Sequence, residues 1–391
     1  NAVAHAVGVR ITELPITPDK VLTALHKDDP PRSYHLWRRP GRWWIAAMRW
    51  AYPRGVHALL HRYGTRFARP RPAPVTPRLE TPTTVEAAVS ALGAKNAAPL
   101  GGGTDLVPLA DQAIRRPAVL VDLLRVPEMR RIDGEEVGGG LRIGGAVTLA
   151  DLLRDERTAR YPALREALGT IATPQIREMA TVAGNLCQTK RCWFFRNGFE
   201  CYKRGGASCP CYAVLGDSRF YHAVVDAHRC QAVTPSDLGT VLTALDATLH
   251  VTGRSGARTM PIAKLYRGPG ETTLAADDVI TQISLPAPAA RRSHFEKIRL
   301  WEGDFAVVSV AIDLDVTGGV VSDARVVLGA TAPTPLRVRA AEEALEGRTL
   351  DDETIAHAST AWAESAHPLP RNEWKVDAAC GLLARALEAM R

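Results

Sequence analysis

Several common features are missing from this sequence. No run of 18 apolar residues occurs, so no helix is predicted to span a membrane. The cysteine-rich region has no C-x-x-C pair, the spacing on which structural zinc sites are usually built. The chain does not begin with Met, and nothing near Asn1 combines the basic, apolar and cleavage regions of a signal peptide. We therefore expect a cytoplasmic protein whose N-terminus is trimmed or processed, or belongs to something longer.

The overall composition is that of a folded, soluble protein. Its 391 residues exceed what one hydrophobic core usually holds, so two or three domains are expected. The net charge is +7, but much of the excess arginine lies in residues 32–72, interleaved with tryptophans. That pattern is typical of a docking or lipid-facing segment. No nucleic-acid partner is expected, and membrane contact is expected only through residues 32–65.

Composition and periodicity divide the chain into four regions. Residues 1–65 form an N-terminal extension, and the Pro- and Arg-rich residues 66–82 are an extended linker. Residues 83–286 alternate strand-like and helix-like segments around a loop-rich zone that contains most of the cysteines. Residues 287–391 contain alternating strands and then helices, which predicts an α+β lobe with an antiparallel sheet backed by helices.

Two loops of small residues are candidates for binding an anion. Residues 101–105 (GGGTD) follow a predicted strand and precede a helix, where backbone N–H groups can face a phosphate. Residues 180–185 (ATVAGN) form a second such loop around a hydroxyl. Each loop alone also fits a turn that binds nothing, and GGGTDL lacks the third small residue of the G-x-G-x-x-G motif. Together they favour a cofactor with a diphosphate.

Six of the seven cysteines fall within residues 187–230. Disulfides are not the expected use, because the chain is large and the count is odd. Five of them are spaced as single thiols through a long loop: Cys192, Cys201, Cys209, Cys211 and Cys230. This spacing leaves an iron–sulfur cluster, a zinc ion or free buried thiols open, with the cluster favoured. Basic neighbours that would offset a cluster's negative charge are Lys190, Arg191, Arg196, Lys203 and Arg204.

Several motifs occur in an order that resembles one protein family. The chain contains, in sequence, APLGGGTDLVPL, IGGAVTLADL, PQIREMATVAGN, TPSDLGTVLTALDA, KIRLWEGDFAVVSVAI and PRNEWKVDAACGLLARAL. They resemble the FAD-binding (medium) subunits of the molybdenum hydroxylases, of the xanthine dehydrogenase, aldehyde oxidoreductase and 4-hydroxybenzoyl-CoA reductase type. The resemblance covers residues 78–391. It implies an α+β protein with a PCMH-type FAD-binding fold of two subdomains, followed by a C-terminal α+β flavoprotein domain.

The resemblance also implies where FAD binds. The implied cofactor-binding residues are Leu100, Gly101, Gly102, Gly103, Thr104, Asp105, Leu106, Ala146, Thr181, Gly184, Asn185, Asp237 and Lys297. The two loops would hold the pyrophosphate, Asp237 would reach the ribityl or flavin side, and Lys297 would lie near the isoalloxazine and tune it. No other residue is expected to be catalytic, because the flavin is the reactive group. Without the resemblance, Asp237 reads as a helix cap.

In one branch of this family, an insertion carries a [4Fe-4S] cluster. Residues 186–233 look like that insertion, and its ligands then match Cys192, Cys201, Cys209 and Cys230. The position of the fourth cysteine differs between two branches of the family. Cys230 matches the position in one of them, so it is preferred to Cys211 as the fourth ligand. The remaining cysteines and histidines are interpreted as structural: Cys187 and Cys380 as packed side chains, His222 and His228 as hydrogen-bonding residues.

Residues 1–26 look like the tail of the molybdenum-binding subunit, which suggests a gene fusion or a processed precursor. We expect residues 1–65 to wrap onto a partner subunit. The implied partners are a molybdenum-cofactor subunit and a [2Fe-2S] subunit in a heterotrimer. Export of the folded complex on a partner's signal is the alternative to a cytoplasmic location.

The implied function is to pass electrons from those subunits through FAD to NAD, oxygen, a quinone or a small carrier. A non-redox nucleotide-binding module with a structural zinc site is the alternative from another class. A stand-alone flavin oxidase is a third reading.

Overall fold

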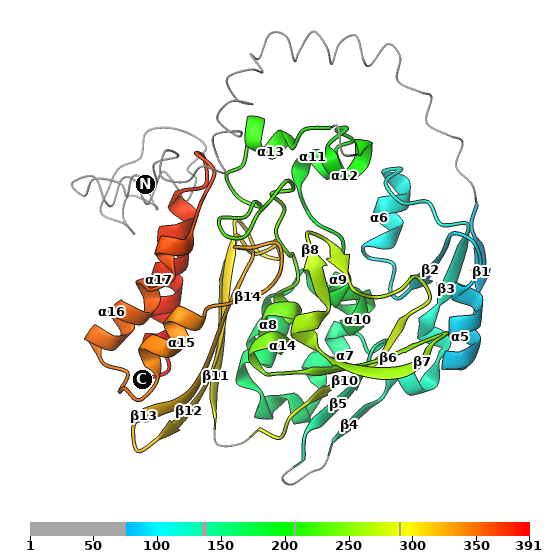
Figure 1. Ribbon diagram of the computed structural model, residues 1–391. Coiled ribbons are helices and arrows are strands. Elements are labelled where there is room, and N and C mark those ends of the chain that lie inside the picture. The colour runs from blue at the N-terminus through cyan, green and yellow to red at the C-terminus, as the bar shows by residue number, and fades with distance from the viewer. Residues whose placement is uncertain (1–75, 135–138, 207–208, 289–290) are drawn as a thin grey trace.

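The structure is a computed structural model that describes residues 76–134, 139–206, 209–288 and 291–391 (Figure 1). The N-terminal extension, most of the linker and the candidate membrane-contact segment lie outside the described residues. Within the described ranges, no helix combines the length and apolar character needed to cross a bilayer.

The first subdomain is a small parallel sheet with strand order β1-β3-β2. Its elements are β1 (Arg78–Glu80), α5 (Val85–Leu92), β2 (Ala97–Leu100), α6 (Leu106–Asp111) and β3 (Val119–Asp122). Helix α5 begins after Thr84, whose side chain accepts a hydrogen bond from the N–H of Ala87. Pro99 is tolerated because β2 is an edge strand. Strand β1 falls in the stretch expected as a linker, so the end of that stretch belongs to the sheet.

The second subdomain is an antiparallel sheet with strand order β4-β5-β10-β6-β7. Its strands are β4 (Ile132–Gly134), β5 (Leu141–Gly144), β6 (Thr248–Gly253), β7 (Gly256–Pro261) and β10 (Val279–Leu285). Helices α7 (Leu149–Arg154), α8 (Pro162–Thr170) and α14 (Asp237–Ala244) share one buried core with these strands. The two-stranded sheet β8 (Tyr266–Gly268) and β9 (Glu271–Thr272) follows β7 in the chain.

The C-terminal domain is an antiparallel sheet backed by helices, as expected. The sheet has the order β11 (Arg292–Ile298), β12 (Val308–Thr317), β13 (Val320–Gly329) and β14 (Leu336–Arg337). Helices α15 (Arg339–Leu345), α16 (Asp352–Thr360) and α17 (Trp374–Glu388) lie on its outer side (Figure 1). Strand β12 contacts α17 as well as α14 and α8 of the second subdomain. It is therefore covered on both faces, and its residues Val308–Leu314 are all buried, including Ser309 and Asp313.

The cysteine-bearing segment has little regular structure. It follows α9 (Pro174–Met179) and α10 (Val182–Leu186), and contains the single turns α11 (Trp193–Arg196), α12 (Tyr202–Gly205) and α13 (Tyr212–Leu215). Short 3₁₀ turns elsewhere are Leu123–Arg125, Pro127–Arg130, Glu156–Arg160, Ile262–Lys264 and Ala363–Ser365. Hydrogen bonds attach this segment to the first subdomain and to the C-terminal domain. Asp105 accepts from the N–H of Thr189, and Lys375 donates to the carbonyls of Phe220 and His222.

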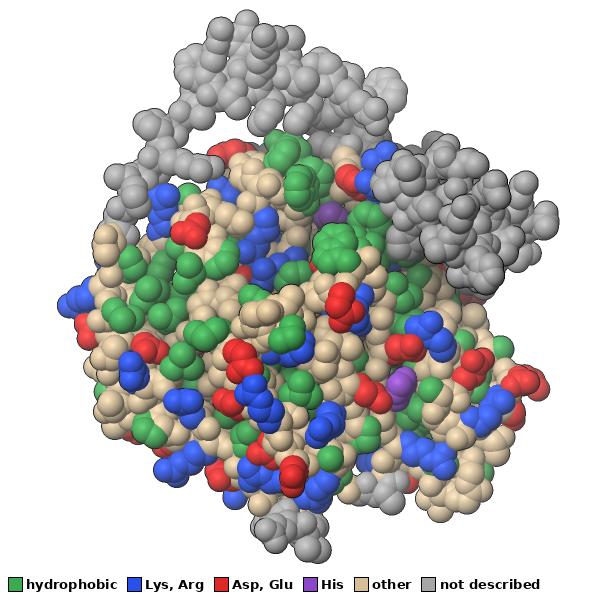
Figure 2. Space-filling view, turned by 180° about the vertical axis from the view of Figure 1, so that it is seen from behind, with side chains coloured by type: hydrophobic (Ala, Val, Ile, Leu, Met, Phe, Trp, Pro, Cys, Tyr) green, Lys and Arg blue, Asp and Glu red, His purple; other side chains and the backbone are tan. Residues whose placement is uncertain are grey.

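The basic excess of the chain lies outside the described part. Residues 1–75 hold 13 of the 49 Lys and Arg residues but only four of the 42 Asp and Glu residues. The rest of the chain has no basic excess. Seen from behind, basic and acidic side chains are interspersed over the lower part of the described surface (Figure 2).

Candidate functional site

The two loops of small residues meet in the structure. A Cβ on Gly102 would lie 1.6 Å from the carbonyl oxygen of Met179, and a Cβ on Gly101 would lie 2.6 Å from Oγ1 of Thr181. Gly103 has φ +73°, a conformation that favours glycine. Glycine is therefore required here because the chain after β2 passes directly against the turn between α9 and α10.

Hydrogen bonds set the shape of the second loop. Thr181 caps α10, because its Oγ1 accepts from the N–H of Gly184 at 3.2 Å. The hydroxyl of Ser236 donates to Oδ1 of Asn185 at 2.7 Å and also caps α14. The ATVAGN loop is thereby tied to the first turn of α14, which carries Asp237.

A cavity of about 250 Å³ opens beside these loops, between the first two subdomains and the C-terminal domain. Six of the residues expected to bind FAD line it: Thr104, Asp105, Gly184, Asn185, Asp237 and Lys297. The others lie behind the wall or away from it: Leu100, Gly101, Gly102, Gly103, Leu106, Ala146 and Thr181. Gly101 and Gly102 support the opposing loop, and Ala146 is buried with its N–H bonded to the carbonyl of Met129.

Asp237 and Lys297 form a buried ion pair in the cavity wall. Nζ of Lys297 lies 2.9 Å from Oδ2 of Asp237, and the two side chains are 2% and 7% exposed. The same Nζ donates to the carbonyl of Asp304 at 3.2 Å. Asp237 is the first residue of α14, whereas Ser236 is the cap. The pair thus joins the second subdomain to β11 of the C-terminal domain.

Asp105 lies between the first loop and the cysteine-bearing segment. It contacts Arg191 at 2.9 Å and Arg196 at 2.7 Å. Burial would raise the pKa of Asp105, but Arg191, the N–H of Thr189 and Arg196 outweigh it and hold that pKa below its usual value. Burial lowers the pKa of Arg191 to about 10, although the negative charge of Asp105 acts to raise it. The guanidinium therefore remains charged near neutral pH.

Sequence reasoning missed much of the cavity wall. The additional lining residues are Leu149, Ile171, Ala172, Thr173, Ile176, Ala180, Gln188, Arg191, Pro235, Gly303, Asp304 and Phe305. Most are apolar or come from segments distant in the chain, so no local pattern marks them. One available signal was GDF in KIRLWEGDF, which contributes Gly303, Asp304 and Phe305 to the wall.

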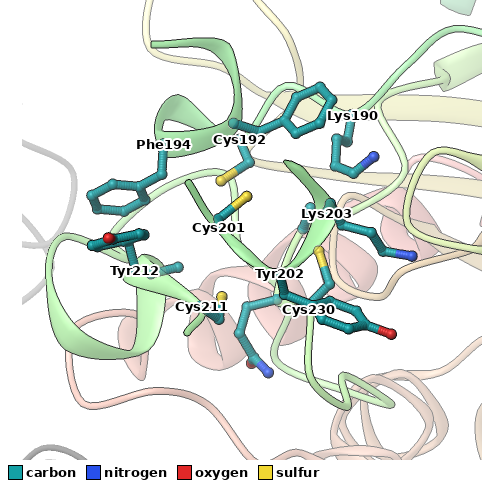
Figure 3. A pocket seen from close by; sticks show the side chains of 13 residues that line it. Lys190, Cys192, Phe194, Cys201, Tyr202, Lys203, Cys211, Tyr212 and Cys230 are labelled. Carbon is teal, nitrogen blue, oxygen red and sulfur yellow. The ribbon is translucent and has the colours of Figure 1, made fainter. Parts of the chain in front are cut away.

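A second, smaller pocket gathers four thiols (Figure 3). Cys192, Cys201, Cys211 and Cys230 line it, together with Phe194, Phe195, Tyr202 and Tyr212 and the basic side chains Lys190 and Lys203. Cys209, expected as a ligand, is not among the lining residues. Its sulfur is close to Gly205, where a Cβ would lie 2.4 Å from it. The structure therefore brings together three of the four expected ligands, with Cys211 in the remaining place.

Burial changes the pKa values of the thiols that line the pocket and of the neighbouring His222. Burial raises the pKa of the Cys192 thiol to about 12 and that of Cys230 to about 11. Binding a metal there must therefore release protons. Nε2 of His222 lies 3.4 Å from Sγ of Cys192, which agrees with a hydrogen-bonding role. Burial, aided by Lys375, lowers the pKa of His222 to about 4.

The four thiols do not form a single-ion site. Among the described residues, no three His, Cys, Asp or Glu side chains are close enough to hold one metal ion. The pocket encloses about 10 Å³, so a larger group requires the thiols to move apart. Two cysteines were expected to be packed side chains. Cys380 is buried in α17. Cys187 is exposed as a whole residue, but its thiol is buried, and this burial raises the thiol pKa to about 12.

Comparison with known proteins places the chain in a family. Residues 75–288 match the family "FAD binding domain in molybdopterin dehydrogenase", and residues 293–390 match "CO dehydrogenase flavoprotein C-terminal domain". The two matches define a flavoprotein with the two-domain α+β fold described above. The chain belongs to the FAD-binding flavoprotein subunits of the molybdenum hydroxylases.

Individual relatives agree with this assignment. The FAD-binding subunit of an aldehyde oxidoreductase from Escherichia coli (strain K12) is 35% identical over 80% of this chain and 97% of its own. The medium chain of carbon monoxide dehydrogenase from Hydrogenophaga pseudoflava is 28% identical over 81% and 98%. A solved structure of carbon monoxide dehydrogenase from that organism superposes with a TM-score of 0.66 at 28% identity, covering 81% of this chain and 97% of the other. None of these similarities supports a [4Fe-4S] cluster. The prediction of a cluster therefore depends on the cysteines alone.

Proposed function

We propose that this chain is the electron-transfer subunit of a molybdenum-dependent hydroxylase complex and carries both FAD and a [4Fe-4S] cluster. The observation that supports this is that two neighbouring residues line the two pockets. Arg191 lines the cavity beside the glycine loops, and Cys192 lines the thiol pocket. The same stretch of chain would therefore contribute to both cofactor sites.

The residues of the larger cavity suit FAD. The backbone around Thr104 and Gly184 would face the diphosphate, Asp237 would accept from sugar hydroxyls, and Lys297 would lie near the isoalloxazine. When bound, FAD supplies the exchange of electrons with an external acceptor. Gly101 and Gly102 would contribute indirectly, because they allow the first loop to approach the α9–α10 turn closely.

For the cluster we propose the ligands Cys192, Cys201, Cys211 and Cys230, so that Cys211 replaces Cys209 in the expected set. All four line one pocket, and Lys190 and Lys203 lie beside them to offset negative charge. In a cubane each thiolate binds its own iron, so the sulfurs need not converge on one point.

We also propose partner subunits and domain boundaries for this chain. Membership of the family supports a heterotrimer with a molybdenum-cofactor subunit and a [2Fe-2S] subunit. We propose that residues 83–286 bind FAD, that residues 287–391 form the C-terminal domain, and that residues 1–65 dock on a partner. A cytoplasmic location stays a prediction, as does the acceptor: NAD, oxygen, a quinone or a small carrier.

Metal and flavin analysis of the purified complex tests the proposal. Beyond the iron of the [2Fe-2S] subunit, we expect FAD and four irons per copy of this chain. Cys211→Ser should lose the cluster, whereas Cys209→Ser, its matched control two residues away, should retain it. The reverse result would restore Cys209 as the ligand. A colourless protein with stoichiometric zinc would favour the non-redox nucleotide-binding module, and turnover of a substrate by the isolated chain would favour a flavin oxidase.

A further inference from the structure

Arg191 presents a partly buried cation to the larger cavity. Its side chain is 21% exposed, and its Cζ lies over the Phe305 ring, 4.5 Å from the ring centre. Phe305 lines the same cavity, so the guanidinium packs on part of the wall. Its Nε is buried and has no hydrogen-bond partner among the described residues. A buried donor without a partner points to a ligand that is not part of the chain.

The charges around Arg191 are not balanced locally. Asp105 is one carboxylate, and it faces both Arg191 and Arg196. One positive charge therefore remains at this end of the cavity. Elsewhere in the wall, Asp237 and Lys297 neutralise each other.

The third carboxylate that lines the cavity, Asp304, already accepts hydrogen bonds from other groups of the chain. Asp304 accepts from the hydroxyl of Tyr221 at 2.6 Å and from the N–H of Phe305 at 2.8 Å. Arg191 contacts Asp105, the chain neighbour of Thr104, so this cation lies beside the first loop of small residues.

We propose that Arg191 binds the diphosphate of FAD, so that the cysteine-bearing segment supplies part of the cofactor site. The two loops offer backbone N–H groups but no cation, and a guanidinium matches phosphate oxygens with two parallel donors. Phe305 and Asp105 hold it in place before the cofactor arrives. The inference rests on the proposed function, since it requires FAD in this cavity.

The test compares FAD affinities in the full complex after the flavin is released. Arg191→Met should weaken FAD about 10- to 100-fold, the range for losing a charged hydrogen bond. Arg196→Met is the matched control, because it removes the other guanidinium from Asp105 without touching the cavity. It should weaken FAD by a much smaller factor. Equal losses in the two variants would mean that Arg191 acts only by anchoring the segment, and would overturn the proposal.

ADP separates the diphosphate from the flavin as a probe. Arg191→Met should weaken ADP by about the same factor as FAD. Loss for FAD alone would place the guanidinium at the flavin, against the proposal. If Arg191→Met does not fold, Arg191→Lys provides the test, because lysine keeps the positive charge but lacks the two parallel donors of the guanidinium. We expect Arg191→Lys to bind FAD several-fold more weakly. An unchanged FAD affinity would refute the assignment. A wild-type complex that binds no FAD would instead refute the proposed function.

Discussion

Lys297 and Asp237 meet across the boundary between the two domains, with 2.9 Å between Nζ and Oδ2. Lys297 is on β11 and Asp237 begins α14, so the pair fixes the C-terminal sheet at the edge of the larger cavity. Because both side chains are almost fully buried, removing either one leaves the other without its ion-pair partner in the protein interior.

Breaking this pair on one side should be costly. Lys297→Met leaves the Asp237 carboxylate buried without its cation, and we expect the free energy of unfolding to fall by about 3–5 kcal/mol. The double variant Lys297→Met with Asp237→Asn should recover most of that loss, since no buried charge remains. Denaturant unfolding of the three proteins measures both values. A double variant no more stable than the single one would show that the pair is not the cause.

Gly102 should not tolerate a side chain. In Gly102→Ala the new Cβ would meet the backbone oxygen of Met179, so the two loops must separate. We expect lower thermal stability and at least tenfold weaker FAD binding. Gly381→Ala is the control, because its Cβ meets nothing within 4 Å and it lies inside α17. That change should stabilise the protein by about 0.5–1 kcal/mol. Normal FAD affinity in Gly102→Ala would contradict the loop contact.

The contact between Glu166 and His294 should depend on pH. Oε2 of Glu166 lies 3.1 Å from Nδ1 of His294 and also accepts from the N–H of Phe295. This carboxylate raises the pKa of His294 above its ordinary 6.5. The folded state then binds the proton more tightly than the unfolded state, so the stabilisation is complete below the unfolded pKa and is lost as pH rises through the folded one.

His294→Gln tests that dependence. The difference in free energy of unfolding between wild type and variant should be larger at pH 6 than at pH 9. Urea unfolding at both values gives the two differences. A difference that stays constant, or grows with pH, would mean that the ion pair does not stabilise the domain contact.

Lys375 should anchor the cysteine-bearing segment. Its Nζ donates to the carbonyls of Phe220, His222 and Ala330 at 2.5–2.9 Å, and its side chain is fully buried. Lys375→Met would remove this donor from all three carbonyls, but the carbonyl of His222 would still accept from Nδ2 of Asn372. We therefore expect a loss of about 1–3 kcal/mol for each of the other two. We expect faster amide exchange around residues 220–224 and poorer iron retention. Lys95→Met, at an exposed position, is the control and should change neither.

Much of the fold was predictable because local patterns agree with it. The capping Thr84, the strand AVLVDL and the Gly-Gly turn between β12 and β13 are short-range signals that tertiary packing did not override. The start of β1 was missed, because a Pro- and Arg-rich stretch has no strand period and pairs only with a distant partner, β3. The family resemblance supplied Asp237 and Lys297, which lie 60 residues apart and meet in the cavity.

What the sequence determined on its own was the set of chemical groups: two loops of small residues, a cluster of thiols and an α+β pattern that can bury them. Which groups face one another was decided only by the tertiary structure. Cys209 and Cys211 are nearly equivalent in the sequence, yet only Cys211 lines the thiol pocket. Arg191 looked like one of several basic neighbours, yet it lines the other cavity. The physical reason is that an irregular segment has no period from which side-chain direction can be inferred, so its direction is set by distant anchors such as Asp105 and Lys375.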